Sequence, residues 1–222
     1  MEENKRIHTA KKEWDAYSDE YFAENASKEI VERIIEDPSW AFPAPVWDMI
    51  RSSYPNLRGK NVLVPSSGDN AAVFAFRLLG AAVTSVDISE RQLENARRIA
   101  ADHGWNIRFV CDDSMSLTKI EDGMYDLVYT SNGVHVWIPD LLSMYRSFHR
   151  VLNKDGQHIM YEVHPVIRPF GDDEVPIITV RKLYENIDFT DDVPKFAWRI
   201  QDIFNTAFDA GFKITHMEEF HP

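Results

Sequence analysis

The 222-residue chain lacks several features that would define its class at once. It has no run of about 18 consecutive apolar residues, which excludes an ordinary membrane-spanning helix. Its single cysteine, Cys111, excludes an internal disulfide and a cysteine-based zinc site, and we expect no metal. The stretch 1–15, MEENKRIHTAKKEWD, lacks the apolar core of a secretory signal. We therefore expect a cytoplasmic protein with no membrane partner.

Basic residues are also scarce relative to acidic ones. The chain has 24 lysines and arginines against 36 aspartates and glutamates, a formal net charge of −12. An acidic surface repels phosphate backbones, and no dense run of basic residues offsets it. Nucleic acid is therefore not the expected partner.

What the sequence does contain is a regular alternation of short apolar runs and helix-like runs. Apolar, strand-like runs occupy residues 61–66, 82–89, 107–112, 125–131, 156–164 and 213–220. Helix-like runs occupy residues 9–36 in two parts, 46–53, 70–80, 90–104, 138–156 and 195–212. This order is typical of an α/β protein with a Rossmann-like, doubly wound, mostly parallel sheet and flanking helices.

The first loop of this predicted sheet, PSSGDN, contains a single glycine. Ser66, Ser67, Gly68, Asp69 and Asn70 place polar atoms at the start of a helix. A pyrophosphate would fit poorly, because Asp69 adds negative charge where a phosphate would lie. A ligand with an ammonium group fits better, while a plain turn with a helix cap remains the alternative.

The second loop follows an acid at the end of the second predicted strand. Asp87 lies 19 residues after Gly68, the spacing at which a carboxylate accepts hydrogen bonds from both ribose hydroxyls. Asp87 and the adjacent Ile88 are therefore candidates for a ribose site. The alternative is that Asp87 caps the next helix, a role that Ser89 can fill alone.

Polar residues also follow the third and fourth predicted strands. In CDDSMSL, Asp113 or its neighbour Asp112 can accept a hydrogen bond from an exocyclic amine such as that of adenine; a solvated turn carboxylate is the alternative. In TSNGVHVWIPD, Asn132 and Gly133 form a tight bend beside the site. His135 follows this bend and is equally explained as a buried histidine at a helix entry.

Taken together, these loops resemble the class I S-adenosylmethionine-dependent methyltransferases, in particular small-molecule members of the methyltransferase type 11-like group. The resemblance covers residues 61–163 through LLGAAVTSVDIS, ENARRIA, CDDSMSL, DGMYDLVYTSNGVHVWIPD and LLSMYRSFHRVLNKDGQHIMYEV. It implies S-adenosylmethionine as cofactor and methyl transfer to a small-molecule acceptor.

The resemblance also implies roles for individual residues. The Gly68 loop would lie against the methionine part of the cofactor, and Asp87 would bind the ribose hydroxyls. Asp113, with the backbone of Ser114 and Met115, would bracket adenine, and residues 132–134 would lie near the methionine end. The family's acidic-x-Gly-x-Gly-x-Gly pattern is here VPSSGDN, so Asp69 would replace the missing acid toward the amino group.

Aromatic residues of the first predicted helix resemble the lead-in helix that covers the cofactor in small-molecule members. Trp14, Tyr17 and Tyr21, together with Trp137, could hold a sulfonium by cation–π attraction. Ordinary core packing is the alternative for each of them, and for any single one it is the favoured explanation. Trp14 and Tyr21 are our cofactor-binding candidates in this group.

A general base would be needed for a hydroxyl acceptor. His135, His164 and Glu162, in that order, lie near carboxyl ends of predicted strands. The segment 165–194 interrupts the alternation, and we expect it to shape the acceptor pocket through Arg168, Phe170, Arg181 and Tyr184.

We expect a single methyltransferase domain over residues 1–222. Its parts would be an N-terminal helical lid (1–58), the cofactor-binding core (59–164), the insertion (165–194) and a last helix and strand (195–222). The family's last antiparallel strand has no matching segment, so it is supplied otherwise or the chain is truncated, and the exposed edge would favour a homodimer. Two rival functions stay open: a non-catalytic module that binds S-adenosylmethionine or S-adenosylhomocysteine, and, less favoured without a three-glycine loop, a nicotinamide-dependent dehydrogenase.

Overall fold

The computed structural model describes residues 2–68, 70–131, 133–165 and 195–220, with only the backbone for residues 2–8 and 25. Asp69, Asn132 and nearly all of the predicted insertion therefore lie outside the described residues, including Arg168, Phe170, Arg181 and Tyr184.

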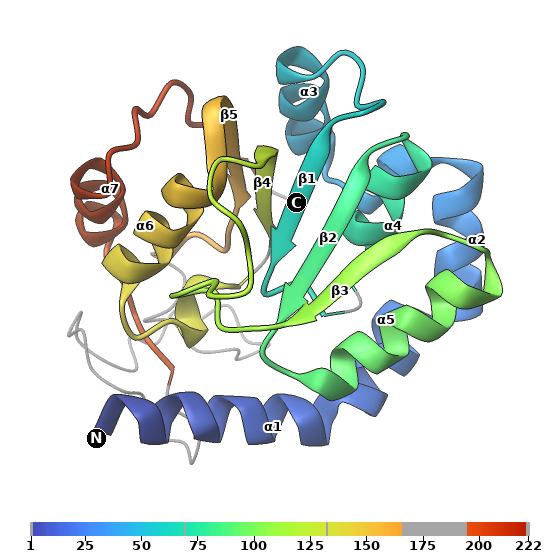
Figure 1. Cartoon of the computed structure of the whole chain (residues 1–222), viewed down its shortest axis with the longest axis horizontal. Helices are drawn as coiled ribbons and strands as arrows, with labels where there is room; N and C mark the ends of the chain where they lie inside the picture. Colours follow the sequence, from blue (N-terminus) through green and yellow to red (C-terminus); the bar gives the residue numbers. More distant parts are fainter. Residues whose placement is uncertain (1, 69, 132, 166–194, 221–222) are drawn as a thin grey trace, which may run out of the picture.

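A five-stranded parallel sheet forms the centre of the fold, as the alternating pattern predicted (Figure 1). Its strands are β1 (Asn61–Pro65), β2 (Ala82–Asp87), β3 (Ile107–Cys111), β4 (Tyr125–Ser131) and β5 (Leu152–Tyr161). Their spatial order is β3-β2-β1-β4-β5, and every pairing is parallel. The strand order reverses between β1 and β4, which is where ligands bind in open α/β sheets.

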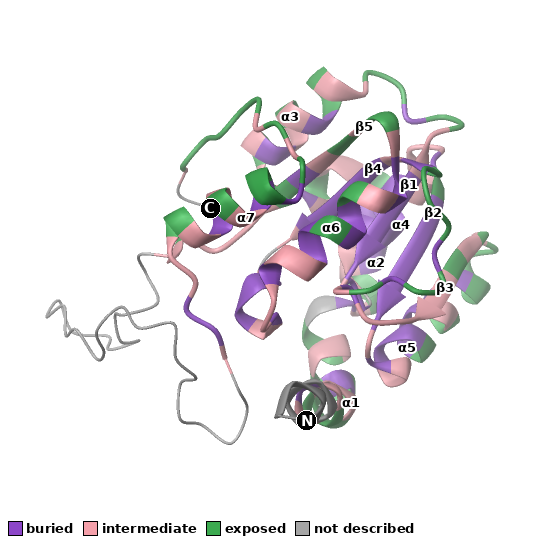
Figure 2. Ribbon diagram, turned by 60° about the vertical axis from the view of Figure 1, so that its left-hand side comes forward, coloured by how far each residue is buried: buried purple, intermediate pink, exposed green. Residues whose placement is uncertain are grey.

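Helices cover both faces of this sheet. They are α1 (Glu2–Asn25), α2 (Lys28–Glu36), α3 (Ala44–Ser53), α4 (Ala71–Leu78), α5 (Glu90–Asp102), α6 (Leu141–Val151) and α7 (Ile200–Asp209), with the short 3-10 helices η1 (Pro38–Ala41) and η2 (His135–Trp137). One hydrophobic core contains side chains of α2 to α5, and the other contains side chains of α6 and α7. Figure 2 shows the central strands β1, β2 and β4 largely buried between these layers, whereas the edge strands β3 and β5 are partly exposed.

The period of two along β1 explains how one strand serves both cores. Val62 and Val64 belong to the first core, whereas Leu63, between them, belongs to the second. All three are essentially fully buried. A strand covered on both faces has to be apolar throughout, which is why NVLVP shows no polar alternation.

Side-chain caps set the starts of three helices next to the carboxyl ends of strands. Asn70 Oδ1 accepts from the Ala72 N–H at α4, and Ser89 Oγ accepts from the Gln92 N–H at α5. The Asp140 carboxylate caps α6 through the Ser143 N–H. These caps hold the loops that precede them, because an uncapped helix start leaves backbone donors unpaired.

Two predicted details are wrong. The stretch 213–220 forms no strand: its apolar residues Ile214, Met217 and Phe220 are three apart, so they cannot share one face of a strand, and most of the stretch is exposed. The helix predicted over 138–156 begins at Leu141 and ends at Val151, where β5 starts directly.

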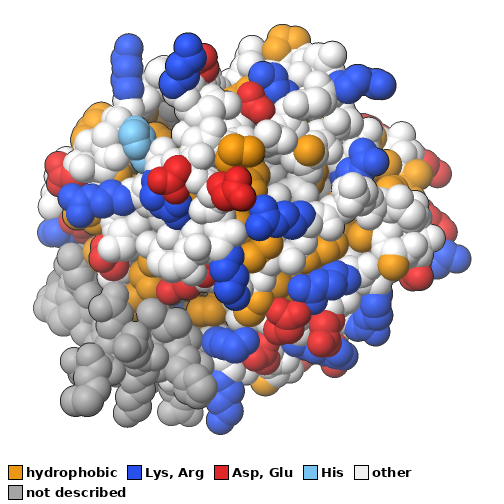
Figure 3. All heavy atoms as spheres, in the orientation of Figure 1, with side chains coloured by type: hydrophobic (Ala, Val, Ile, Leu, Met, Phe, Trp, Pro, Cys, Tyr) orange, Lys and Arg blue, Asp and Glu red, His pale blue; other side chains and the backbone are white. Residues whose placement is uncertain are grey.

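The first helix lies at the end of the molecule toward which the strands point (Figure 1). It runs across the carboxyl ends of the strands and packs against α5. No helix among the described residues is long and apolar enough to cross a membrane. On the face seen in Figure 3, basic, acidic and apolar side chains are interspersed.

Candidate functional site

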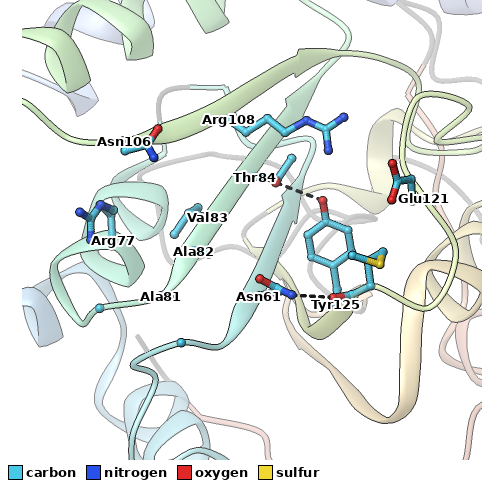
Figure 4. A pocket seen from close by; sticks show the side chains of 13 residues that line it. Asn61, Arg77, Ala81, Ala82, Val83, Thr84, Asn106, Arg108, Glu121 and Tyr125 are labelled. Atoms are coloured by element: carbon cyan, nitrogen blue, oxygen red, sulfur yellow. Dashed lines mark hydrogen bonds between the residues drawn. The ribbon is translucent and has the colours of Figure 1, made fainter.

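Two cavities lie at opposite ends of the sheet. The larger, of about 490 Å³, opens at the amino ends of the strands. In Figure 4 the Tyr125 hydroxyl donates to Thr84 Oγ1 in this cavity, and Arg77, Asn106 and Arg108 lie around it. The smaller, of about 170 Å³, lies at the carboxyl ends, beside the reversal of strand order. The general position of ligands in open α/β sheets makes the smaller cavity the candidate site, and we call it the switch-point pocket.

The switch-point pocket collects most of the residues that the sequence singled out. Those that line it are Trp14, Tyr21, Ser66, Ser67, Gly68, Asp87, Ile88, Asp113, Ser114, Met115, Gly133 and Trp137. They come from α1 and from the loops after β1, β2, β3 and β4. Because these loops are remote in sequence, their convergence is a consequence of the parallel sheet.

The turn after β1 is held by serine pairs. Ser66 has a positive φ of 50°, which is uncommon for a residue with a side chain. Its hydroxyl lies 2.7 Å from that of Ser114, and the hydroxyl of Ser67 lies 2.7 Å from that of Ser85 on β2. These bonds tie the turn to the loop after β3 and to strand β2.

Asp87 is the acid at the centre of the pocket. Its two carboxylate oxygens accept from the N–H groups of Gly68 and Ser89, each at 2.8 Å. Burial nevertheless raises the pKa of Asp87 to about 6, against these backbone hydrogen bonds. A carboxylate has about four acceptor positions, so two remain after these bonds. Asp87 can therefore accept from a pair of ligand hydroxyls.

Helix α1 is fastened to the start of α5. Lys11 Nζ donates to the Ile88 carbonyl at 2.9 Å, and Ser89 Oγ donates to the Asp15 carboxylate at 2.6 Å. The Arg91 guanidinium makes two hydrogen bonds of 3.0 Å to Asp19. We call these contacts the α1 latch. They join the cover of the pocket to the residues that directly follow Asp87.

Aromatic side chains form part of the pocket wall. The ring of Trp14 on α1 lies 5.3 Å from that of Trp137 on η2 and 5.6 Å from that of Tyr21. Tyr17 contacts Trp14 as well, but its side chain is 41% exposed and does not line the pocket. The aromatic contact thus closes α1 onto the loop after β4.

The two acids after β3 have different environments. Asp113 lines the pocket, and its Oδ1 accepts from the Met115 N–H at 2.9 Å. Asp112 points elsewhere: its carboxylate accepts from the N–H groups of Asp113 and Lys119 and from the Thr118 hydroxyl. Asp112 therefore shapes the loop, and it is absent from the pocket lining.

The three base candidates do not line the pocket. Glu162 accepts from the backbone N–H groups of Gly133 and His135, at 2.7 and 3.0 Å. His135 is buried, with its ring nitrogen Nε2 2.9 Å from the Tyr145 hydroxyl. His164 pairs at the surface with Glu219. Glu162 and His135 thus stabilise the loop after β4 without lining the pocket.

Sequence reasoning missed several lining residues: Ala10, Gln92, Ser131, Ile138 and Pro139. Gln92 could have been found from the sequence, because it lies in the first turn of the helix that follows Asp87 and therefore at the same end of the sheet. Asn70, identified only as a loop residue, also lines the pocket and donates to Ser131 Oγ at 2.9 Å. Among the described residues, no cluster of histidine, cysteine, aspartate or glutamate is arranged to hold a metal ion.

Comparison with known proteins agrees with this geometry. Residues 65–156 match the methyltransferase domain family. The chain is 28% identical over 191 residues to the uncharacterized methyltransferase YbaJ of Bacillus subtilis, covering 79% of this chain and 74% of the relative.

Solved structures with similar folds include two methyltransferases. One, an S-adenosylmethionine-dependent methyltransferase from Mesorhizobium loti, matches with a TM-score of 0.66 and 24% identity over 80% of this chain and 85% of its own. The other, a putative methyltransferase from Bacillus halodurans, matches with a TM-score of 0.61 and 18% identity over 78% of this chain and 71% of its own. Residues 65–156 are thus similar to the methyltransferase domain family, and the fold of the chain is similar to the folds of these two structures.

Proposed function

We propose that the switch-point pocket binds S-adenosylmethionine and that the protein transfers its methyl group to a small-molecule acceptor. The observation that supports this most strongly is the convergence of Gly68, Asp87 and Asp113 in one pocket beneath α1. Each comes from a different strand end, and together they match the three parts of the cofactor in the order that the resemblance implies.

The residues present fit this cofactor. Asp87 keeps acceptor positions for the ribose hydroxyls, since its two bonds to backbone N–H groups use only part of its capacity. We assign the adenine side to Asp113, Ser114 and Met115, and the methionine side to the turn at Gly68 and the loop at Gly133. We also retain Asp69 and Asn132, which lie outside the described residues, as proposed contacts at the methionine end.

Bound S-adenosylmethionine would supply a methyl group on a cationic sulfonium. The chain's own contribution is to orient the partners and to exclude water, which together can lower a barrier by several kcal/mol. The rings of Trp14, Tyr21 and Trp137 line the pocket and are our candidates to hold this cation. The α1 latch keeps two of these rings over the pocket.

The acceptor is proposed to be small because α1 covers the pocket. The cavity between α1 and the sheet measures about 170 Å³, and its outer wall is aromatic. A small organic molecule can share a helix-covered site with the cofactor once the site widens, whereas a folded macromolecule would have to displace α1 altogether.

His135, Glu162 and His164 remain the proposed candidates for a base, should the acceptor require one. The Glu162 carboxylate accepts from the backbone N–H groups of Gly133 and His135, which favours a positioning role for Glu162 and His135. In this view Glu162 fixes the loop against which the acceptor lies.

Calorimetric titration with S-adenosylmethionine and S-adenosylhomocysteine tests the proposal. Binding in the micromolar range is expected, together with methyl transfer to at least one member of a small-molecule acceptor panel. Failure to bind at millimolar cofactor would refute the proposed cofactor. Binding without transfer to any acceptor would favour the rival role as a non-catalytic module.

A further inference from the structure

Gln92 occupies the first turn of α5 and lines the switch-point pocket beside Asp87 and Gly68. Its side chain is only 3% exposed, which is unusual for a glutamine. It also lies against the turn after β1: a Cβ atom at position 68 would be 1.7 Å from Gln92 Oε1. The amide is thus enclosed between α5 and the turn, at the wall of the pocket.

The amide nitrogen of Gln92 is an unpaired donor. Nε2 is buried and has no hydrogen-bond partner among the described residues. A buried amide without a partner destabilises a fold, so an unpaired one at a pocket wall is a marker of an absent partner. By contrast, both carboxylate oxygens of the neighbouring Asp87 accept hydrogen bonds, and the hydroxyls of Ser66 and Ser67 are paired as well.

We propose that Gln92 is a further cofactor-binding residue whose Nε2 donates a hydrogen bond to a ribose hydroxyl oxygen that also donates to Asp87. This inference rests on the proposed function, because it requires a ribose in the switch-point pocket. It assigns to Gln92 a task that Asp87 cannot perform, since an ionised carboxylate only accepts.

The chemistry of a hydroxyl group explains why both residues are needed. A hydroxyl has one donor and two acceptor positions. The ribose hydroxyl donates its hydrogen to Asp87. Because an ionised carboxylate has no hydrogen to donate in return, the acceptor positions of the hydroxyl oxygen stay unpaired. The amide N–H of Gln92, in the first turn of α5, fills one of them. Together the two residues recognise ribose and discriminate against a deoxyribose.

The size of the pocket indicates when this contact forms. At about 170 Å³ the pocket is smaller than the roughly 300–1,000 Å³ that is usual for ligand sites. Binding of a ligand therefore requires the pocket to widen. The Gln92 nitrogen, which no hydrogen bond restrains, can then turn toward the ligand.

The test is calorimetric binding of S-adenosylhomocysteine, which does not react, to the wild type and to Gln92→Met. Methionine keeps the length of the side chain but has no donor. We expect Gln92→Met to bind about five- to tenfold more weakly, within the range of one hydrogen bond. Two further ligands are the 2′-deoxy and the 3′-deoxy analogues of S-adenosylhomocysteine. The analogue that lacks the hydroxyl contacted by Gln92 should bind the wild type and Gln92→Met equally.

Gln201→Met is the matched control, because Gln201 is exposed in the first turn of α7. It should leave affinity unchanged. Gln92→Met should melt at the same temperature as the wild type or higher, since an unpaired buried donor is removed. Three results would each overturn the inference. Gln92→Met could bind S-adenosylhomocysteine as tightly as the wild type, it could bind both deoxy analogues more weakly than the wild type by the same factor, or it could melt at a lower temperature than the wild type. If the wild type itself fails to bind S-adenosylhomocysteine, the proposed function fails as well, which separates the two results.

Discussion

The Ser89 hydroxyl donates a 2.6 Å hydrogen bond to the Asp15 carboxylate, joining residues 74 positions apart. Ser89 also caps α5, because the same oxygen accepts from the Gln92 N–H. One hydroxyl therefore couples the helix that covers the switch-point pocket to the helix that begins beside Asp87. Movement of α1 away from the pocket has to break this bond.

Asp15→Asn should accelerate release of S-adenosylhomocysteine about fivefold. Asp15 accepts from Ser89 and also pairs with Lys11 at 3.3 Å. Its side chain is 38% exposed, so solvent screens these contacts and about 1 kcal/mol is a reasonable loss. Stopped-flow fluorescence of Trp14 and Trp137 would measure the release rate. Glu32→Gln is the control, because Glu32 forms an exposed pair with Lys28 on α2.

Asp87→Ala should weaken cofactor binding at least tenfold, because two hydrogen bonds to ribose are lost along with the charge. Calorimetry would measure this, with Asp102→Ala at the exposed far end of α5 as control. An affinity equal to that of the wild type would refute the ribose assignment.

Cofactor affinity should fall as the pH decreases through about 6. Hydroxyl donors favour the ionised form of Asp87, whose pKa burial raises to about 6 in the free protein. Protons therefore compete with the ligand below that pH, and titrations at pH 5 and pH 7.5 would reveal it. Asp87→Asn should abolish the difference between the two titrations.

The stability of the free protein should follow pH in the opposite direction. The pKa of Asp87 is higher in the folded state than the usual 3.8, so ionisation of Asp87 disfavours the fold. The contribution of the protonated Asp87 carboxyl to the free energy of unfolding is fully present below pH 3.8. It is lost as the pH rises through about 6, and the total loss is about 3 kcal/mol. Denaturant unfolding of Asp87→Asn against the wild type isolates this part; parallel pH curves would contradict the prediction.

Gly68→Ala should be more damaging than Gly104→Ala. Both glycines have positive φ, 49° and 65°, so each alanine should cost about 1 kcal/mol in backbone strain. Only at position 68 would the new Cβ also collide with Gln92, whereas nothing lies within 4 Å at position 104. Thermal unfolding would compare the two. Adding Gln92→Ala to Gly68→Ala should recover part of the loss, and strictly additive effects would exclude the collision.

Glu162→Gln should lower the free energy of unfolding by about 2 kcal/mol. The Glu162 side chain is 9% exposed, and its carboxylate accepts from the N–H groups of Gly133 and His135. If Glu162 only positions this loop, the turnover rate should fall while the pH profile of the rate keeps its shape. A shifted pH profile would instead assign it as a base. Glu36→Gln, at the exposed end of α2, is the control.

Much of the site could be predicted because strand ends are visible in a sequence. Apolar runs such as 61–65 and 82–87 locate the strands, and parallel pairing brings the residues that follow them to one edge. Gly68, Asp87 and Asp113 were therefore predictable as neighbours. The strand predicted at 213–220 is wrong, because the apolar residues of this stretch are three positions apart and a strand requires a period of two.

The amino-acid sequence by itself determined the alternating α/β order, the caps at Asn70 and Ser89, and the polar loops at the carboxyl ends of the strands, because these depend on local periodicity and short-range hydrogen bonds. Only the tertiary structure decided the rest. It turned Asp112 away from the pocket and buried His135 behind it, fastened Asp15 to Ser89, and left Gln92 Nε2 unpaired at the pocket wall. These outcomes depend on contacts between residues distant in the chain, where burial and the available partners, rather than residue type, set what each polar group can do.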